Sequence, residues 1–502
     1  MQFTEISFAI FFSVVFIIYW LVLRRYVIMQ NILLLASSYL FYGWWDWRFL
    51  GLIIATTVST FVTAMGARSK YGFLLTVTNI VLNIGILAIF KYLNFFSENL
   101  QRLFNLLGWN LDWFTIDVLL PVGISFYTFQ AIAYSVDVYR KRIEVCHDPV
   151  AFATFIAYFP QLVAGPIERA AQLLPQIERP RTWSTEYASS GLRMVLYGIL
   201  KKVCVADMLA IYADRLFLSS MSSPLIILIA GLLFTLQIYC DFSSYSEIAR
   251  GTSRLLGIEL MANFRFPLFS RNILEFWQRW HISLMLWFKD YVYIPLGGNR
   301  HSRSRTIINT FIIFLLSGMW HGASWNFIIW GAYWAIVYTV GKFAIGLSRR
   351  DDTIELSNLP SVAITFGVVS FGFFLFRCNS WHQMYTGFTC IWIYLLAFSL
   401  LWVITKIMCR TGISQTTMIF IGIAASVIVC MSGYFYWTKL LKAWWLLPAL
   451  MVTVIEWRSR NMDYPLQYIS KRSSVRLTLY WICIALIILS EPVDMTFIYF
   501  QF

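Results

Sequence analysis

Residues 306–340 read TIINTFIIFLLSGMWHGASWNFIIWGAYWAIVYTV, and the interpretation of the whole chain starts from this stretch. Two apolar runs are joined by residues 317–325, where Trp320 and His321 stand among small side chains. Apolar runs of this kind are typical of helices that cross a membrane. Ionisable side chains are rare at membrane depth and usually line a cavity or a reaction path. His321 therefore indicates proton chemistry inside a membrane.

The composition of the whole chain points to the same class of protein. Of 502 residues, 59% are hydrophobic and only 13% are charged, which is far below the roughly 25% charged residues of soluble domains. Several apolar runs reach the ~20 residues that a spanning helix needs. A transmembrane β-barrel would instead show alternating segments of about 10 residues. We expect an all-α, polytopic transmembrane protein that forms a single domain over residues 1–502.

The distribution of charges and cysteines argues against a nucleic-acid-binding protein and against a protein that depends on disulfides or a metal site. The net charge is +14, but the basic residues form short clusters between apolar runs, at 141–142, 201–202, 300–305, 349–350, 458–460 and 471–472. Such clusters mark cytoplasmic loops that face anionic membrane lipids, so we expect no nucleic-acid partner. The eight cysteines are scattered without a C-x-x-C pair, and they predict neither disulfides nor a metal site.

The apolar runs also predict a topology. Spans are expected near residues 6–23, 29–45, 48–65, 72–92, 117–137, 184–206, 224–248, 307–322, 324–346, 360–377, 386–408, 416–434, 438–456 and 477–490. With the basic clusters in the cytoplasm, the number of crossings is even and both termini lie outside. No Lys or Arg precedes residues 6–23, and Arg24 and Arg25 follow them, so this run is expected to be a span rather than a signal peptide.

Residues 151–163 are too short and too interrupted for a full crossing. They run into FPQLVAGPIE at 159–168, which contains two prolines and one glycine. Broken backbone at membrane depth persists only where protein or a water-filled cavity satisfies it. We expect a re-entrant segment that lines a cytoplasmic entrance, and a plain Pro-rich loop is the alternative.

Residues 275–290, EFWQRWHISLMLWFKD, predict one amphipathic helix. Helical spacing places Trp277, His281, Leu284 and Phe288 on one face and Glu275 with Arg279 on another. A helix with an aromatic face and a charged edge belongs at the membrane interface, partly sunk into the protein. The fold is therefore expected to combine spanning helices with re-entrant and interfacial helices around a central tunnel.

Two histidines in apolar elements are the main candidates for chemistry. If a helix starts near Thr306, His321 lies about 22 Å along it, within the ~30 Å hydrocarbon core. Taken singly, each could be a packed, neutral histidine. Taken together, and with no other buried titratable cluster expected, His281 and His321 can converge on one cavity. His147, His301 and His382, the last in a polar loop at 379–385 placed outside, are expected to be ordinary surface residues.

Four motifs in a fixed order resemble a known family. They are QLVAGPIE at 161–168, FWQRWH at 276–281, YVYIPLGG at 291–298 and MWHG at 319–322. This order resembles the membrane-bound O-acyltransferases, and most of all the bacterial branch of alginate O-acetylation, peptidoglycan O-acetylation and teichoic acid D-alanylation. The resemblance runs over most of the chain and is most specific in residues 266–330. It implies that His321 is the hallmark catalytic residue and His281 the second signature position.

The chain ends in FIYFQF, residues 497–502, which the topology places outside. Aromatic surface this large is unfavourable in water, so the ending is expected either to pack as an interfacial belt or to insert back into a cavity. It resembles the C-terminal aromatic-tyrosine motif of the same branch, whose tyrosine is proposed to carry the acyl group outward as an ester. By that resemblance, Tyr499 is the candidate carrier.

The resemblance implies an O-acetyltransferase of the bacterial cytoplasmic (inner) membrane. Acetyl-CoA would enter from the cytosol past residues 160–168 and 250–305, and Arg271, Arg279 and Arg300 could steer its phosphates. His321 would act as general base, while His281 would position the thioester or polarise its carbonyl. The acyl group would then pass to a periplasmic SGNH-type acetyltransferase and to a polysaccharide such as alginate.

Two alternatives remain open at this point. One is a transporter or flippase without covalent chemistry, since transporters use the same kinds of spanning and broken helices. The other keeps the enzyme but has it acylate peptidoglycan, another cell-wall glycan or a lipid-linked glycan directly. The sequence identifies neither the final acceptor nor the length of the acyl chain.

Overall fold

The structure is a computed structural model that describes residues 1–109, 121–219, 223–348, 353–410, 446–467, 473–490 and 497–498. Within these residues all regular secondary structure is helical. The first half contains α1 (Ile6–Ile17), η1 (Ile18–Val22), α2 (Val27–Gly43), η2 (Trp47–Phe49), α3 (Leu50–Met65), α4 (Gly72–Leu106), α5 (Ile124–Tyr139), α6 (Pro149–Ala157), α7 (Phe159–Leu162), α8 (Ala170–Glu178), α9 (Thr185–Lys201), η3 (Lys202–Ala206), α10 (Asp207–Leu218) and α11 (Pro224–Leu255).

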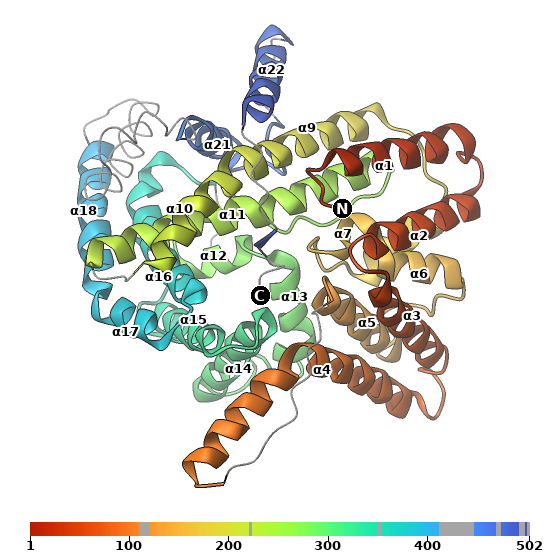
Figure 1. The fold of residues 1–502 in the computed structure, drawn as a ribbon, viewed down its shortest axis with the longest axis horizontal. Helices are drawn as coiled ribbons and strands as arrows, with labels where there is room; N and C mark the ends of the chain where they lie inside the picture. The colour runs from red at the N-terminus through yellow and green to blue at the C-terminus, as the bar shows by residue number, and fades with distance from the viewer. Residues whose placement is uncertain are drawn as a thin grey trace.

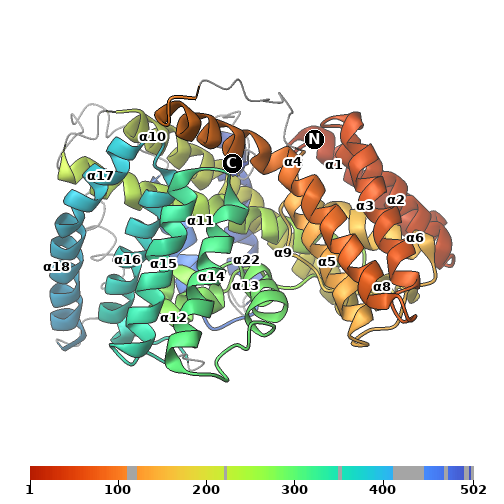
Figure 2. The ribbon, with the colours of Figure 1, turned by 90° about the horizontal axis from the view of Figure 1, so that it is seen from below.

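The second half contains η4 (Pro267–Phe269), α12 (Ile273–Arg279), α13 (Ile282–Phe288), η5 (Lys289–Tyr293), α14 (Arg303–His321), α15 (Trp325–Phe343), η6 (Leu356–Asn358), α16 (Leu359–Arg377), α17 (Trp381–Thr389), α18 (Ile391–Arg410), α21 (Leu446–Ser459) and α22 (Ser473–Leu489). In Figures 1 and 2, α1–α3 and α5–α8 gather on one side and α14–α18 on the other, with α11 and α13 between them.

Helix α11 is the central element of the fold. It begins at Pro224, after Ser223 caps its first turn by accepting a hydrogen bond from the Leu225 amide. Proline suits the first helical position because its fixed φ is helical and no donor is lost there. Most of α11 is buried, and it packs along α9, α10 and α16. Because other helices cover most of its length, α11 organises the core.

Among the residues that the structure describes, four helical stretches are long and apolar enough to cross a membrane: Trp47–Met65, Gly72–Leu106, Pro224–Leu255 and Leu356–Arg377. A fifth crossing is formed if α17 and α18, which are bent by 46°, count as one broken span. The expected all-α membrane protein is therefore confirmed. Residues 416–434 and part of 438–456 lie outside the described residues, so the even number of crossings and the outer position of both termini stay predictions.

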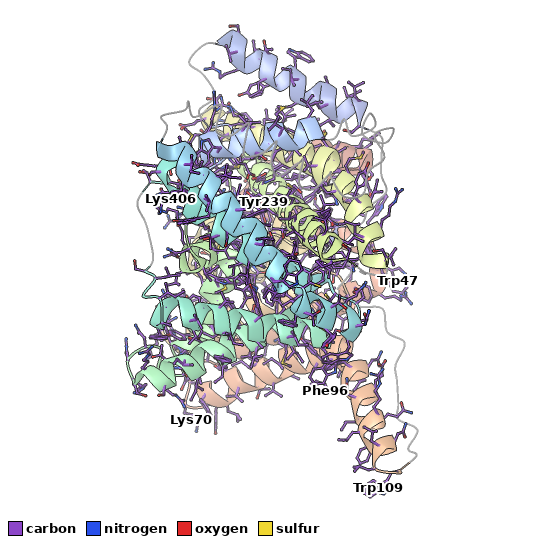
Figure 3. All side chains as sticks on the ribbon, turned by 90° about the vertical axis from the view of Figure 1, so that its left-hand side faces the viewer. Trp47, Lys70, Phe96, Trp109, Tyr239 and Lys406 are labelled. Atoms are coloured by element: carbon purple, nitrogen blue, oxygen red, sulfur yellow. The ribbon has the colours of Figure 1, made fainter. Side chains whose placement is uncertain are left out.

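Helix α4 differs most in length from its predicted span, which was expected to end near residue 92. It continues to Leu106 and carries its far end, including Trp109 just beyond it, away from the other helices (Figure 3). Phe96 and Trp109 are 51% and 60% exposed. The start of α4 lies with the first group of helices, and its middle reaches across to α14 (Figure 2).

The prediction of one continuous helix over residues 275–290 is wrong. The chain breaks after Arg279, and His281 adopts a left-handed conformation with φ of 44° before α13 begins. The break lets aromatic residues pack in two directions: Trp277 contacts Trp334 of α15, while Trp280 contacts Phe373 of α16. Because both rings are buried, this segment is surrounded by protein, and its place at the membrane interface stays a prediction.

The interruption predicted near residue 160 is present as a broken helix. Tyr158 separates α6 from α7 with ψ of 109°, and nearly all of residues 151–168 are buried. The freed backbone groups have protein partners: the Ser38 hydroxyl accepts from the Phe159 amide, and Gln161 donates to the Phe155 carbonyl. The plain-loop alternative does not hold, whereas the position of this segment at a cytoplasmic entrance stays a prediction.

Candidate active site

His321 is the last residue of α14, and the packing of α14 on α15 determines where it lies. A Cβ atom on Gly318 would stand 2.2 Å from the Phe327 carbonyl oxygen, and one on Gly331 would stand 2.4 Å from that of Phe314. Only glycine allows the two backbones to approach this closely. The His321 ring is 7% exposed and lies 5.1 Å from the ring of Trp330. The imidazole is thus held in an almost closed aromatic pocket.

His281 is fixed by the backbone break and by Asn263. Its Nδ1 lies 3.1 Å from Oδ1 of Asn263. The same oxygen accepts hydrogen bonds from the amide and the hydroxyl of Ser283, at 3.2 and 3.0 Å. The residue is 1% exposed, and positive φ is uncommon outside glycine. Ser283 thus holds the side chain of Asn263, and Asn263 orients the His281 ring.

The structure brings the two histidines to one aromatic side chain. The ring of Trp320 lies 5.8 Å from that of His281 and 5.0 Å from that of His321, and both contacts are edge-to-face. Phe126 lies 5.3 Å from the same indole ring. His281 lies at the break between α12 and α13, and His321 lies 40 positions later at the end of α14. The tertiary fold therefore brings the two rings together.

Lys91 and Tyr92 of α4 hold the end of α14, and sequence reasoning missed both. The Lys91 ammonium donates to the carbonyls of Trp320 and His321, at 2.6 and 2.9 Å, and the Tyr92 hydroxyl donates to that of Met319 at 2.7 Å. The last carbonyls of a helix have no partner inside it and favour a cation. A lysine within an otherwise apolar span was the signal that could have identified Lys91.

The described part of the C-terminal segment is inserted into the protein. Phe497 and Ile498 are 3% and 1% exposed. The Phe497 ring lies 4.9 Å from Tyr245 and 6.0 Å from Phe242. Phe242 in turn lies 4.8 Å from the His281 ring. Of the two placements expected for the ending, these residues adopt insertion; Tyr499 itself lies outside the described residues.

A cavity with about 610 Å³ of empty space, part of it open to solvent, adjoins this segment. Its lining includes Phe497, Tyr245 and Lys202, the first residues of the chain, and Phe41 and Trp45. Phe497 therefore borders open space as well as protein. A continuous central tunnel stays a prediction.

Two buried clusters of charge contradict the expectation that the histidines are the only buried titratable groups. Lys201 contacts Glu456 at 2.8 Å and Glu247 at 3.4 Å. Lys202 contacts Asp241 at 2.7 Å and Asp207 at 2.8 Å. Asp207 follows Lys202 by only five positions, but Asp241 and Glu247 come from α11 and Glu456 comes from α21. The convergence of these three carboxylates on two adjacent lysines could not be read from the sequence. In the part of the chain that the structure describes, no group of three or more His, Cys, Asp or Glu is placed to hold a metal ion.

The three arginines predicted to steer a donor lie in different environments. Arg271 and Arg279 both bind the buried carboxylate of Glu275, at 2.9 Å each. Arg271 also donates to the Thr353 carbonyl at 3.2 Å. Arg300 is exposed in the loop before α14. Arg271 and Arg279 thus share one carboxylate, whereas Arg300 is open to solvent; their role toward a donor stays a prediction.

Comparison of the sequence with known proteins identifies the class to which this helical membrane protein belongs. Residues 141–380 match the model of the membrane-bound O-acyltransferase family. The chain is 38% identical over 389 residues to a probable alginate O-acetylase AlgI of Pseudomonas syringae, and the aligned region covers 76% of this chain and 73% of that protein. It is 32% identical over 378 residues to the peptidoglycan O-acetyltransferase of Helicobacter pylori, and this alignment covers 69% of the present chain and 71% of the relative.

A more distant relative is the teichoic acid D-alanyltransferase of Bacillus subtilis, which is 28% identical over 283 residues, covering 52% of this chain and 70% of that protein. The chain belongs to the membrane-bound O-acyltransferase family, as its motifs predicted, and it is an acyltransferase of a membrane. The alternative of a transporter without covalent chemistry is set aside.

Proposed function

We propose that the protein takes an acetyl group from cytosolic acetyl-CoA and passes it across the bacterial inner membrane for O-acetylation of an extracytoplasmic polysaccharide. The observation that carries this proposal is the convergence of His281, His321 and the C-terminal segment on one set of aromatic rings. An alginate-like exopolysaccharide is the favoured acceptor because the alginate O-acetylases are more similar in sequence than the peptidoglycan enzyme. A periplasmic SGNH-type acetyltransferase would receive the acetyl group, and peptidoglycan or another cell-wall glycan is the alternative acceptor.

In the proposed reaction, His321 removes the proton from the Tyr499 hydroxyl. The phenolate oxygen attacks the thioester carbonyl, the new C–O bond forms as the C–S bond breaks, and the departing thiolate takes the proton from His321. An ordinary phenol with pKa near 10 is almost fully protonated at neutral pH, so the step requires a base. Transferring the group to a tyrosine ester moves the acetyl group outward while CoA stays on the cytosolic side.

The contacts of His281 favour one of its two expected roles. Since Asn263 Oδ1 already accepts from Ser283, the Nδ1–H of a neutral His281 donates to it, and Nε2 is then an acceptor. An acceptor nitrogen can hold an N–H or O–H group of the donor, whereas it would need a second proton to polarise a carbonyl. We therefore assign His281 the positioning of the thioester.

Purified protein in lipid nanodiscs is expected to become labelled when it is incubated with [¹⁴C]acetyl-CoA without an acceptor. One equivalent of CoA should be released for each acetyl group bound, and mass spectrometry should place the label on the C-terminal peptide at Tyr499. The matched control is a thioether analogue of acetyl-CoA, which occupies the donor site but has no thioester bond that can be cleaved. Label on another residue would contradict the role of Tyr499 as acyl carrier. An absence of acetyl-CoA turnover would contradict acetyl-CoA as the acyl donor.

Replacing Lys91 with methionine is expected to lower kcat about 10- to 100-fold and leave the KM for acetyl-CoA unchanged. The reason is that the Trp320 and His321 carbonyls lose their ammonium donor, and a misplacement of about 1 Å at a reacting group can reduce a rate 100-fold. Lys91→Arg keeps a cation and should restore part of the rate. Lys70→Met is the control, since Lys70 is exposed just before α4 (Figure 3). Equal losses in the two methionine variants would contradict a positioning role for Lys91.

A further inference from the structure

A buried ion-pair cluster is attached to the backbone of the C-terminal segment. Oδ2 of Asp241 accepts a hydrogen bond from the Ile498 amide at 2.7 Å. Oδ1 of the same carboxylate lies 2.7 Å from the Lys202 ammonium, which also contacts Asp207 at 2.8 Å. Asp241 is 3% exposed. We call Asp207, Lys202 and Asp241 the tail anchor.

The charge balance of the tail anchor explains why it binds an amide. Two carboxylates face one ammonium, so the cluster carries one formal negative charge in excess. A buried carboxylate is stable only when it is paired and hydrogen-bonded, and a hydrogen bond from an amide to a charged oxygen is about twice as strong as a neutral one. The Ile498 N–H supplies this bond. The C-terminal segment is therefore held at a defined backbone atom as well as by apolar contact.

The tail anchor also fixes the residue that directly precedes Tyr499. The held amide belongs to Ile498, the residue directly before Tyr499, and the Phe497 ring packs on Tyr245 and Phe242. Phe242 contacts the His281 ring at 4.8 Å. One backbone atom and one side chain next to residue 499 are thus both fixed within the neighbourhood of the two histidines.

Lys202 is the first residue of η3, which is a π-helix. It interrupts the helical path between α9 and α10 at residues Lys202–Ala206, and such insertions often occur at functional sites. Across this junction, Lys201 turns toward Glu247 and Glu456 while Lys202 turns toward Asp207 and Asp241. Two neighbouring lysines therefore serve two separate clusters of the same charge.

We propose that Asp241, oriented by Lys202 and Asp207, is a positioning residue that seats the C-terminal segment beside His281 and His321. The inference rests on the proposed function in one respect, namely that the seated segment delivers Tyr499 as the acyl carrier. The seating itself depends on the bond between Asp241 and the Ile498 amide. Loss of either partner should release the segment without altering the binding of acetyl-CoA.

The test removes each partner of this bond in turn. Asp241→Leu removes the acceptor, Asp241→Asn keeps an acceptor oxygen without the charge, and Ile498→Pro removes only the amide hydrogen among the polar groups. Ile498→Val keeps that hydrogen and is the matched control. We expect Asp241→Leu and Ile498→Pro each to lower acetyl transfer at least tenfold with an unchanged KM for acetyl-CoA. Asp241→Asn should fall between Asp241→Leu and the wild type, and Ile498→Val should retain most of the rate that Ile498→Pro loses.

The double variant shows whether the two residues act through each other. If the bond is the cause, Asp241→Leu with Ile498→Pro should be no slower than the slower single variant, because coupled residues do not give additive losses. Losses that multiply would overturn the proposal. If Asp241→Leu fails to fold, Ile498→Pro still tests the bond, since it changes only the end of the chain.

Hydrogen exchange separates this inference from the proposed function. Amide exchange in the C-terminal peptide should accelerate at least tenfold in Asp241→Leu. It should stay unchanged in Glu456→Gln, which alters the neighbouring cluster, whose contacts in the described residues do not include 497–498. Unchanged exchange in Asp241→Leu overturns the tail anchor even if Tyr499 proves essential. Accelerated exchange together with full activity of Tyr499→Phe keeps the tail anchor and overturns the carrier.

Discussion

His321→Ala is expected to reduce the rate of acetyl transfer about 10²- to 10⁴-fold, the range typical of a lost general base. The imidazole ends α14 next to the rings of Trp320, Trp330 and Phe376, at 5.0, 5.1 and 5.2 Å. Alanine leaves the helix and its contact with α15 in place, because the close approach depends on Gly318 and Gly331. The initial rate of CoA release from acetyl-CoA in nanodiscs measures the effect.

The chain contains its own control for this substitution. Trp381-His382 repeats the Trp-His pair at the start of α17, where both residues are exposed. His382→Ala should therefore keep the wild-type rate and elute at the same volume in size-exclusion chromatography. A His321→Ala protein that retains more than a tenth of the rate would show that the base is another group. A similar loss in His382→Ala would show that the assay reports folding.

Tyr499→Phe is expected to abolish labelling of the protein by [¹⁴C]acetyl-CoA and to reduce transfer to the acceptor at least 100-fold. The substitution removes one oxygen and keeps the ring, so the seating of Phe497 and Ile498 is unaffected. Without the phenol there is no nucleophile to form the ester, and the general base has no proton to remove. Counting protein-bound radioactivity and acceptor-bound acetyl groups in the same reaction measures both losses.

An exposed tyrosine provides the comparison. Tyr385 in α17 is 70% exposed, and Tyr385→Phe removes the same atom from a surface position, so labelling should be unchanged. If Tyr499→Phe still transferred acetyl groups while His321→Ala did not, the acceptor hydroxyl would attack the thioester directly. The enzyme would then acylate its glycan or lipid-linked substrate without a carrier on its own chain.

Most of the helices could be predicted because hydrophobic runs are a local property of a sequence. The predicted span near 224–248 corresponds to Pro224–Leu255, which is long enough to cross a membrane, and those near 6–23 and 29–45 correspond to the shorter apolar helices Ile6–Val22 and Val27–Gly43. The polar stretch at 379–385 was wrongly expected to be a loop, since the hydroxyl of Ser380 accepts from the Gln383 amide and starts α17 at Trp381. Polarity alone does not exclude a helix when a good N-cap residue precedes it.

The candidate site was only partly accessible from the sequence. His281 and His321 could be selected because ionisable residues in apolar elements are rare. The support around them could not be predicted, since the partners are remote in the chain: Lys91 and the His321 carbonyl are 230 positions apart, and Asp241 and Ile498 are 257 apart. The left-handed backbone of His281 was also missed, because nothing in the type of residue requires positive φ.

The cluster around Lys201 bears on how the protein is made. Glu456 lies 255 positions after Lys201, so at about 5–20 residues per second the lysine is synthesised roughly 10–50 s before this carboxylate. Glu247 follows Lys201 by 46 positions, so it can balance the lysine for most of that interval. Glu456 also accepts hydrogen bonds from the hydroxyls of Tyr239 and Tyr197. The contacts that join α9 and α11 to α21 through this cluster therefore form late in synthesis.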